Sequence, residues 1–411
     1  MKKTHRQAKR PPVASRGESP AMAREGTIPW NLQALAPAPK IFEDPQRSSD
    51  DVKAIFYEGV PWRGKPTRVF AYYGVPKTQA GQKVPAMVLV HGGGGSAFIP
   101  WVQLWVSRGY AAIAMDTCGC ISGGGYENHP RHEHGGPPGW GGFDQVDQPV
   151  EEQWTYHAVA DVILAHSLIR SFPQVDAERI GVTGVSWGGF LVCIVAGVDH
   201  RFKFVAPVYG CGCLEGTPLW QADFKRMGEA RAQRWLRLWD PAVYLPLAQR
   251  PLLWVTGSND FAFPLDALQK SYRLPRSPKT LCVTVRMAHA HGGPGENPRE
   301  IHAMAESLFA QEAPLARIIR SGREGSEAWV LFAGQVPIVR AELNYTLDAG
   351  AWLQRNWQTT AAALDPQAQK VSAVLPDGVT AYYVNLVDTR GLVVSSEHEP
   401  GPAKPEPSFV N

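Results

Sequence analysis

Hydrophobic residues follow two different patterns along this chain. Residues 52–59 and 67–75 alternate apolar and polar side chains, which is typical of strands with one face in water. Further along, short runs are apolar throughout, and such runs indicate strands of a parallel sheet buried on both faces. These runs are residues 85–90, 109–115, 179–183, 204–209, 252–256 and 281–287.

Helical periodicity separates several of these runs. Residues 150–171 repeat apolar positions every three or four residues, and residues 190–198 form another apolar helical stretch. Before a helix expected at residues 301–309, Asn297 can cap, Pro298 suits the first helical position and Glu300 completes a capping box. Alternating strands and helices predict a doubly wound, mostly parallel α/β domain over residues 51–313.

The pattern changes after residue 313. Short β-rich runs separated by turn residues predict a small, all-β, sandwich-like domain over residues 320–398. The runs are residues 328–332, 338–345, 370–375, 380–386 and 392–395. Residues 1–50 are basic and Pro-rich, and residues 399–411 are rich in Pro and Glu, so a tail is expected at each end.

Composition excludes several classes of protein. The 411 residues carry 41 Lys and Arg against 38 Asp and Glu, a net charge of +3, so no nucleic-acid partner is expected. Hydrophobic residues make up 44%, enough for a large core, but no run of 18 apolar residues predicts a membrane span. Without a visible signal peptide, the default location is cytoplasmic; a secreted or periplasmic protein remains open if a leader is missing.

The strongest chemical signal is a G-x-S-x-G motif, Gly184-Val-Ser186-Trp-Gly188, between a predicted strand and a predicted helix. A serine at such a corner is held in a strained conformation with its hydroxyl exposed at the end of the sheet. The sequence therefore predicts Ser186 as a nucleophile, and a plain tight turn is the alternative.

A second glycine-rich segment, residues 91–95, ends the strand of residues 85–90. Its backbone N–H groups can turn toward a developing oxyanion, so Gly93, Gly94 and the N–H of Trp187 are the candidate oxyanion hole. His91 is expected to brace this loop. A phosphate-binding loop would need Gly-Lys-Ser/Thr, which is absent.

A serine nucleophile needs a base and an orienting acid. Asp260 follows the strand of residues 252–256 and is preferred as the acid over Asp266, which is expected inside the next helix. Two histidines follow the last predicted strand. We prefer His291 as the base, because the small residues beside it would leave its ring mobile, and His289 is the alternative.

Other residues with metal-binding side chains have simpler interpretations. His129, His132 and His134 lie in a stretch with eight glycines that predicts an irregular, substrate-facing loop. Two Cys-Gly-Cys units, at residues 118–120 and 211–213, could bind zinc or form a disulfide, but a tight pocket floor of small residues is preferred. No metal or organic cofactor is expected.

Residues 50–312 resemble the α/β-hydrolase fold, on its dienelactone-hydrolase-like and acetylxylan-esterase-like branch, near the catalytic domains of prolyl oligopeptidases. The resemblance rests on the segments around residues 90–95, 108–112, 179–189, 257–260 and 290–293. It implies Ser186, Asp260 and His291 as a catalytic triad. Dienelactone hydrolases use a cysteine nucleophile and prolyl oligopeptidases carry an N-terminal propeller, and neither feature is seen here.

The expected activity is hydrolysis of a short acyl ester of a carbohydrate or other polar or aryl alcohol, through an acyl-enzyme. Aromatic side chains stack on sugar or aryl rings, and the expected pocket residues are Trp140, Arg131, Trp220 and Cys211. One alternative is a serine peptidase with the same triad, for which Glu151-Glu152 could anchor a peptide terminus. Another is an inert protein whose β domain binds glycans.

Overall fold

The computed structural model describes residues 28–402. The tail expected over residues 1–50 therefore lies partly outside the described residues, and the remainder of that expectation is wrong. Residues 28–50 contain helix α1 (Leu32–Leu35) and strand β1 (Ile41–Glu43). Strand β1 pairs with β2 (Lys53–Glu58), so this segment belongs to the central sheet.

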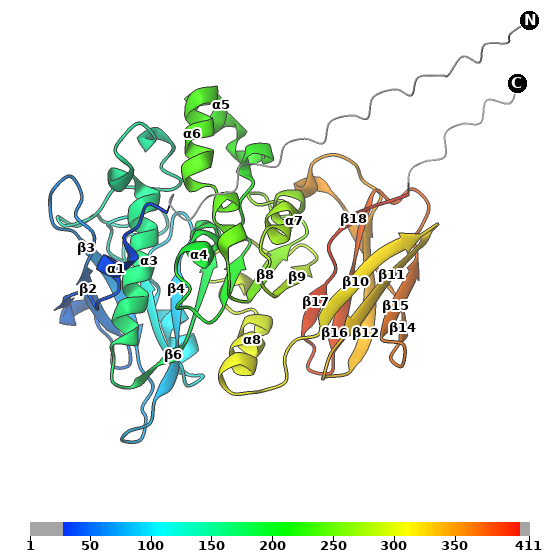
Figure 1. Cartoon of the computed structure of the whole chain (residues 1–411), viewed down its shortest axis with the longest axis horizontal. Coiled ribbons are helices and arrows are strands. Elements are labelled where there is room, and N and C mark those ends of the chain that lie inside the picture. Colours follow the sequence, from blue (N-terminus) through cyan, green and yellow to red (C-terminus); the bar gives the residue numbers. More distant parts are fainter. Residues whose placement is uncertain (1–27, 403–411) are drawn as a thin grey trace, which may run out of the picture.

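Nine strands form that sheet, in the order β1-β2-β3-β5-β4-β6-β7-β8-β9 (Figure 1). After β1 and β2 these are β3 (Arg68–Gly74), β4 (Val84–Val90), β5 (Ala111–Met115), β6 (Val175–Val185), β7 (Val205–Val208), β8 (Leu252–Gly257) and β9 (Lys279–Thr284). The pairs from β5 through β4 to β9 are parallel, and β1, β2 and β3 add an antiparallel edge. The predicted mostly parallel α/β sheet is confirmed.

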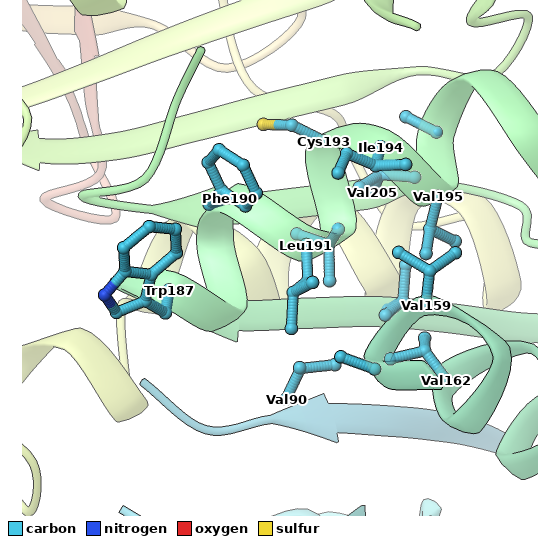
Figure 2. Packing of buried hydrophobic residues seen from close by; sticks show 14 of the residues in the cluster. Val90, Val159, Val162, Trp187, Phe190, Leu191, Cys193, Ile194, Val195 and Val205 are labelled. Atoms are coloured by element: carbon cyan, nitrogen blue, oxygen red, sulfur yellow. The ribbon is translucent and has the colours of Figure 1, made fainter. Parts of the chain in front are cut away.

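Helices cover both faces of the sheet. They are α2 (Ile99–Val106), α3 (Trp154–Arg170), α4 (Trp187–Val198), α5 (Gln221–Met227), α6 (Glu229–Trp239), α7 (Leu265–Arg273) and α8 (Arg299–Phe309). Successive residues of β4 explain the two layers. Val88 packs in the cluster that contains α3, α4 and α7, whereas Leu89 packs in the cluster that contains α2 and α8. Figure 2 shows α4 in the first cluster, with Leu191 between Val90 and the helix axis.

The start of α8 differs from the expected capping box. Pro298 is the residue before the helix, and Asn297 makes no capping hydrogen bond. Instead, the side-chain oxygen of Asn297 lies 2.8 Å from Nε2 of His302. Among the helices of residues 28–402, none is long and apolar enough to cross a bilayer.

The C-terminal part consists of two antiparallel sheets. One has the order β10-β11-β15-β14, and the other has the order β13-β12-β16-β17 with β18 beside β16. The strands are β10 (Arg317–Glu324), β11 (Glu327–Ala333), β12 (Ile338–Thr346), β13 (Trp357–Ala361), β14 (Ala363–Asp365), β15 (Lys370–Val374), β16 (Ala381–Asp388), β17 (Val393–Ser395) and β18 (Glu399–Pro400). Val330 of one sheet and Val384 of the other share a core, as in a sandwich. The tail expected from residue 399 begins instead as strand β18.

Strand β16 joins this β domain to the rest of the molecule. All eight of its residues are buried, because it has apolar neighbours on both faces. Tyr382 and Val384 pack in the sandwich core, whereas Tyr383 packs in the core of the α/β domain. The two parts therefore meet through a buried apolar surface.

The close packing of α4 generates a stability prediction. A Cβ on Gly197 would lie 2.1 Å from the backbone oxygen of Tyr244. We expect Gly197→Ala to lower the free energy of unfolding by about 1–3 kcal/mol, because the clash outweighs the better helix propensity of alanine. Urea unfolding measures this change. Gly216→Ala is the matched control, since its nearest neighbour would be 3.9 Å away; equal stability of the two variants would contradict the prediction.

Candidate functional site

Ser186 lies at the sharp corner between β6 and α4. Its backbone has φ 56° and ψ −120°, a strained conformation for a residue with a side chain. The corner closes only because glycines flank it. A Cβ on Gly184 would lie 2.4 Å from the oxygen of Gly188, and a Cβ on Gly188 would lie 2.0 Å from the oxygen of Val90. The serine thus stands at the carboxyl end of the sheet, as the motif predicts.

Backbone N–H groups surround this serine. Trp187 begins α4, so its N–H has no acceptor in a preceding helical turn. The loop after β4 passes against the serine, because a Cβ on Gly92 would lie 2.8 Å from Cβ of Ser186. Gly93 and Gly94 line the same cavity as Ser186 and Trp187. This arrangement can offer two or more N–H donors to an oxyanion.

His91 connects the glycine loop of residues 92–95 to the segment that follows β5. Its Nε2 accepts a hydrogen bond from the N–H of Thr117 at 3.0 Å, and its Nδ1 lies 2.8 Å from the carbonyl oxygen of Gly92. Full burial lowers the pKa of His91 to about 3. The ring is therefore neutral near pH 7, with Nδ1–H as the donor to Gly92.

Asp260 follows β8 and pairs with a histidine. Its Oδ1 accepts hydrogen bonds from the N–H groups of Ala262 and Phe263, at 2.9 and 2.7 Å. Its Oδ2 lies 2.7 Å from Nδ1 of His289. Asp266, the other candidate acid, lies in the first turn of α7.

The preference for His291 is thereby corrected to the alternative, His289. After β9 the chain turns at Arg286, whose φ is 54°, and this turn brings His289 onto Asp260. The imidazole stacks on Tyr209, with ring centroids 4.1 Å apart and planes 26° apart. Stacking on Tyr209 fixes the ring of His289, so the residue that pairs with Asp260 is held in place and is not the mobile ring expected for the base.

His291 lies beside the glycine loop that follows β4. A Cβ on Gly92, next to Ser186, would lie 3.2 Å from Nε2 of His291. Its Nδ1 is 3.7 Å from Oε1 of Glu296, and its ring centroid is 5.1 Å from that of Phe98. His291 therefore forms a wall of the site without contacting Asp260.

Ser186, His289 and His291 open into one cavity of about 690 Å³. Of the four expected pocket residues, Trp140 and Trp220 line it. Arg131 and Cys211 do not: Arg131 donates to the carbonyls of Cys118 and Gly136, and Cys211 is fully buried. Those two expectations are wrong. Lining residues that the sequence did not reveal include Phe98, Tyr126, Tyr209, Leu219 and Phe261.

The residues considered for metal binding have other partners. Nδ1 of His129 lies 2.7 Å from the carbonyl of Gly123, and His132 packs edge-on against Phe56. Both Cys-Gly-Cys units carry free thiols, and burial raises the pKa of each of them. Within residues 28–402, no three His, Cys, Asp or Glu side chains gather as a metal site would require.

Comparison with known proteins shows similarity in sequence and in fold. Residues 41–233 match the family model of acetyl xylan esterase (AXE1). The structure is similar to the acetyl xylan esterase from Paenibacillus sp. R4, with a TM-score of 0.55 and 23% identity over 68% of this chain and 92% of that one. For the acetyl xylan esterase 1 from Thermoanaerobacterium sp. JW/SL YS485, the TM-score is 0.51 and the identity is 20%, over 68% of this chain and 91% of that one.

The chain has the α/β-hydrolase fold, and just under half of it is similar to the acetyl xylan esterase family. Curated relatives include an uncharacterized peptidase, YuxL of Bacillus subtilis, 24% identical over 46% of this chain and 28% of the relative. Another is dipeptidyl-peptidase 5 of Aspergillus oryzae, 23% identical over 57% of this chain and 31% of the relative. The chain thus spans about a third of the length of these relatives. All of these similarities are to proteins named as esterases or peptidases.

The neutral state of His91 generates a pH prediction. Its pKa is lowered to about 3 in the folded protein, against about 6.5 when unfolded, so the unfolded state binds the extra proton first. The stability that neutral His91 contributes is complete above pH 6.5 and is lost as the pH falls toward 3. Between pH 7 and 5 this amounts to about 2 kcal/mol.

Urea unfolding of wild type and His91→Gln at pH 7 and pH 5 checks this prediction. The glutamine variant is expected to lose about 2 kcal/mol less between the two values, because it has no ring to protonate. Identical pH dependence in both proteins would contradict the assignment of His91 as a buried neutral brace.

Proposed function

We propose that this protein is a serine carboxylic-ester hydrolase that removes a short, acetyl-like acyl group from a carbohydrate or other polar or aryl alcohol. Ser186 attacks the ester carbonyl while His289 accepts its proton, and Asp260 holds the imidazole in the required tautomer. N–H groups of Trp187, Gly93 and Gly94 stabilise the oxyanion. The alcohol leaves with the proton from His289, and water then hydrolyses the acyl-enzyme.

One observation carries this proposal: His289, hydrogen-bonded to buried Asp260, lines the same cavity as Ser186 on its strained corner. No metal or cofactor takes part in the proposed steps. The match of residues 41–233 to the acetyl xylan esterase family supports an ester over an amide as the substrate.

A serine peptidase is the second candidate, supported by the peptidase relatives. It would need charged groups in the cavity to hold a peptide terminus. The expected anchor does not supply them: Glu152 lies 3.7 Å from Arg63 and neither residue lines the cavity. Among the lining residues Glu127 is the one carboxylate, and seven are Phe, Tyr or Trp. These features favour the esterase.

Trp140, Trp220 and Tyr126 give the cavity faces on which a sugar or aryl ring can stack. His129 and Glu127 add polar groups at the same cavity. This combination supports a polar or ring-containing alcohol as the leaving group. The inert glycan-binding alternative is less favoured, because the acid–histidine pair is intact beside Ser186.

We predict rapid hydrolysis of p-nitrophenyl acetate, slower hydrolysis of the octanoate, and little cleavage of aminoacyl-p-nitroanilides. Ser186→Ala should lower kcat for the acetate by about 10³-fold or more, because the nucleophile is lost. Steady-state kinetics with all three substrate types measure this. Faster cleavage of anilides than of esters would favour the peptidase. If the correctly folded protein turned over none of these substrates, the proposal that it is a hydrolase would be wrong.

A second prediction separates the two histidines. His289→Ala should lower kcat by about 10³-fold or more, because the proton acceptor is removed. His291→Ala should lower it much less, because His291 does not contact Asp260. If His291→Ala caused the larger loss, the original preference for His291 would be right and the assignment of His289 would be wrong.

A further inference from the structure

A loop of the C-terminal β domain lies against the catalytic end of the α/β domain. We call residues 351–356, between β12 and β13, the clip loop; it contains a short 3-10 turn, Trp352–Gln354. Contacts inside the loop and with the residues just before it stiffen the loop. The Arg355 guanidinium donates to the Gly350 carbonyl at 2.9 Å and lies 3.8 Å from the ring centroid of Trp352. Asp348 accepts from the N–H of Asn356 at 2.7 Å.

Asn259, the residue before the acid Asp260, is bound to this loop. Its side-chain amide nitrogen donates to three backbone carbonyls of the clip loop, at 3.1, 3.0 and 2.7 Å. The carbonyls are those of Trp352, Leu353 and Arg355. Both N–H donors of the Asn259 amide are therefore used in hydrogen bonds to the β domain.

The orientation of this amide is fixed on its other side. The Ser258 hydroxyl donates to Oδ1 of Asn259 at 2.7 Å, and the same hydroxyl oxygen accepts from the N–H of Arg286 at 3.1 Å. Oδ1 must therefore face Ser258, and the NH₂ group must face the clip loop. A flipped amide would set its oxygen, which can only accept, against the three carbonyl oxygens of the clip loop.

The histidine loop is bound to the same segment. Arg286 precedes His289 by three residues, and its Nη2 donates to Oδ1 of Asn356 at 3.0 Å. At the end of β9, Val283 adds two more contacts: its N–H donates to the Ser395 hydroxyl, and its carbonyl accepts from the amide of Asn385. The β domain thus contacts both loops that carry the proton-transfer pair.

We propose that the C-terminal β domain is a brace that positions Asp260 and His289, acting through the contact of Asn259 with the clip loop. This inference rests on the proposed roles of Asp260 and His289. Asn259 does not line the substrate cavity, so it is a positioning residue. Misplacement of a catalytic group by about 1 Å can cost about 10²-fold in rate, so loss of this contact should be visible in kcat.

The test is Asn259→Ala in the full chain. We expect kcat for p-nitrophenyl acetate to fall about 10- to 100-fold with KM changed less than about threefold, because positioning and not substrate binding is lost. Asn259→Asp keeps the shape but cannot donate, and it should lose at least as much. Asn259→Gln keeps the NH₂ group and should recover part of the rate.

The matched control is Arg299→Ala, which removes the hydrogen bond from Arg299 to the carbonyl of Arg390 in the β domain, beyond the end of β16 that lies opposite the clip loop. Its kcat should stay within about twofold of wild type. An equal loss in this control would overturn the proposal, because any weakened domain contact would then suffice. A wild-type kcat in folded Asn259→Ala would overturn it too. If Asn259→Ala does not fold, Arg286→Ala, which removes the contact with Asn356, replaces it under the same criteria.

Labelling of Ser186 by a fluorophosphonate separates this proposal from the proposed function. Labelling needs an activated serine but no particular ester or amide. If no ester is turned over yet labelling slows at least tenfold in Asn259→Ala, the substrate assignment fails and the brace stands. If esters are turned over while both kcat and labelling are unaffected by Asn259→Ala, the brace fails and the esterase stands.

Discussion

The abrupt turn from β6 into α4 is the constraint on which the site depends. It forces Ser186 to a positive φ, and it is possible only where backbone can approach backbone at Gly184 and Gly188. The strain is maintained because α4 is buried along its whole length and cannot relax away from the sheet. Since the sheet is parallel here, the loops that follow β4, β7, β8 and β9 all begin at this same edge. One corner thereby brings Ser186, the N–H donors, Asp260 and His289 together.

The histidines around this corner show how surroundings divide roles among identical side chains. His91 is enclosed and neutral, with its pKa lowered to about 3, so it supports a loop and cannot act as a base near pH 7. His289 has a carboxylate on Nδ1 and an aromatic ring on its face, which leaves Nε2 for proton transfer. His291 has its ring against Phe98 and its nitrogen toward Glu296. Each environment comes from a different loop, so the residue type alone does not assign the role.

The sequence predicts the central strands well, because strands buried on both faces are uninterrupted apolar runs, as β4 and β8 are. It misses β13, where Trp357 is buried but the other four residues are exposed, so no alternation marks the strand. The position of Asp260 follows from topology, since an acid directly after β8 must lie at the carboxyl edge of the sheet, where Ser186 also lies. The choice between His289 and His291 cannot be made from the sequence, because it depends on a turn at Arg286 that no sequence pattern predicts. The expectation that Arg131 and Cys211 line the pocket was wrong for a similar reason. A residue close to the site in sequence can still point its side chain elsewhere.

Strand β9 explains why the β domain and the catalytic site are coupled. It is the last strand of the nine-stranded sheet, so its outer edge would present unpaired backbone groups to water or to another strand. Ser395 and Asn385 bind the N–H and carbonyl of Val283 at that edge, and Tyr383 buries apolar surface in the adjoining core. The chain then leaves β9 directly into the histidine loop. Protecting this edge and fixing the start of that loop are therefore accomplished by the same contacts, and a domain attached for the first purpose inevitably affects the second.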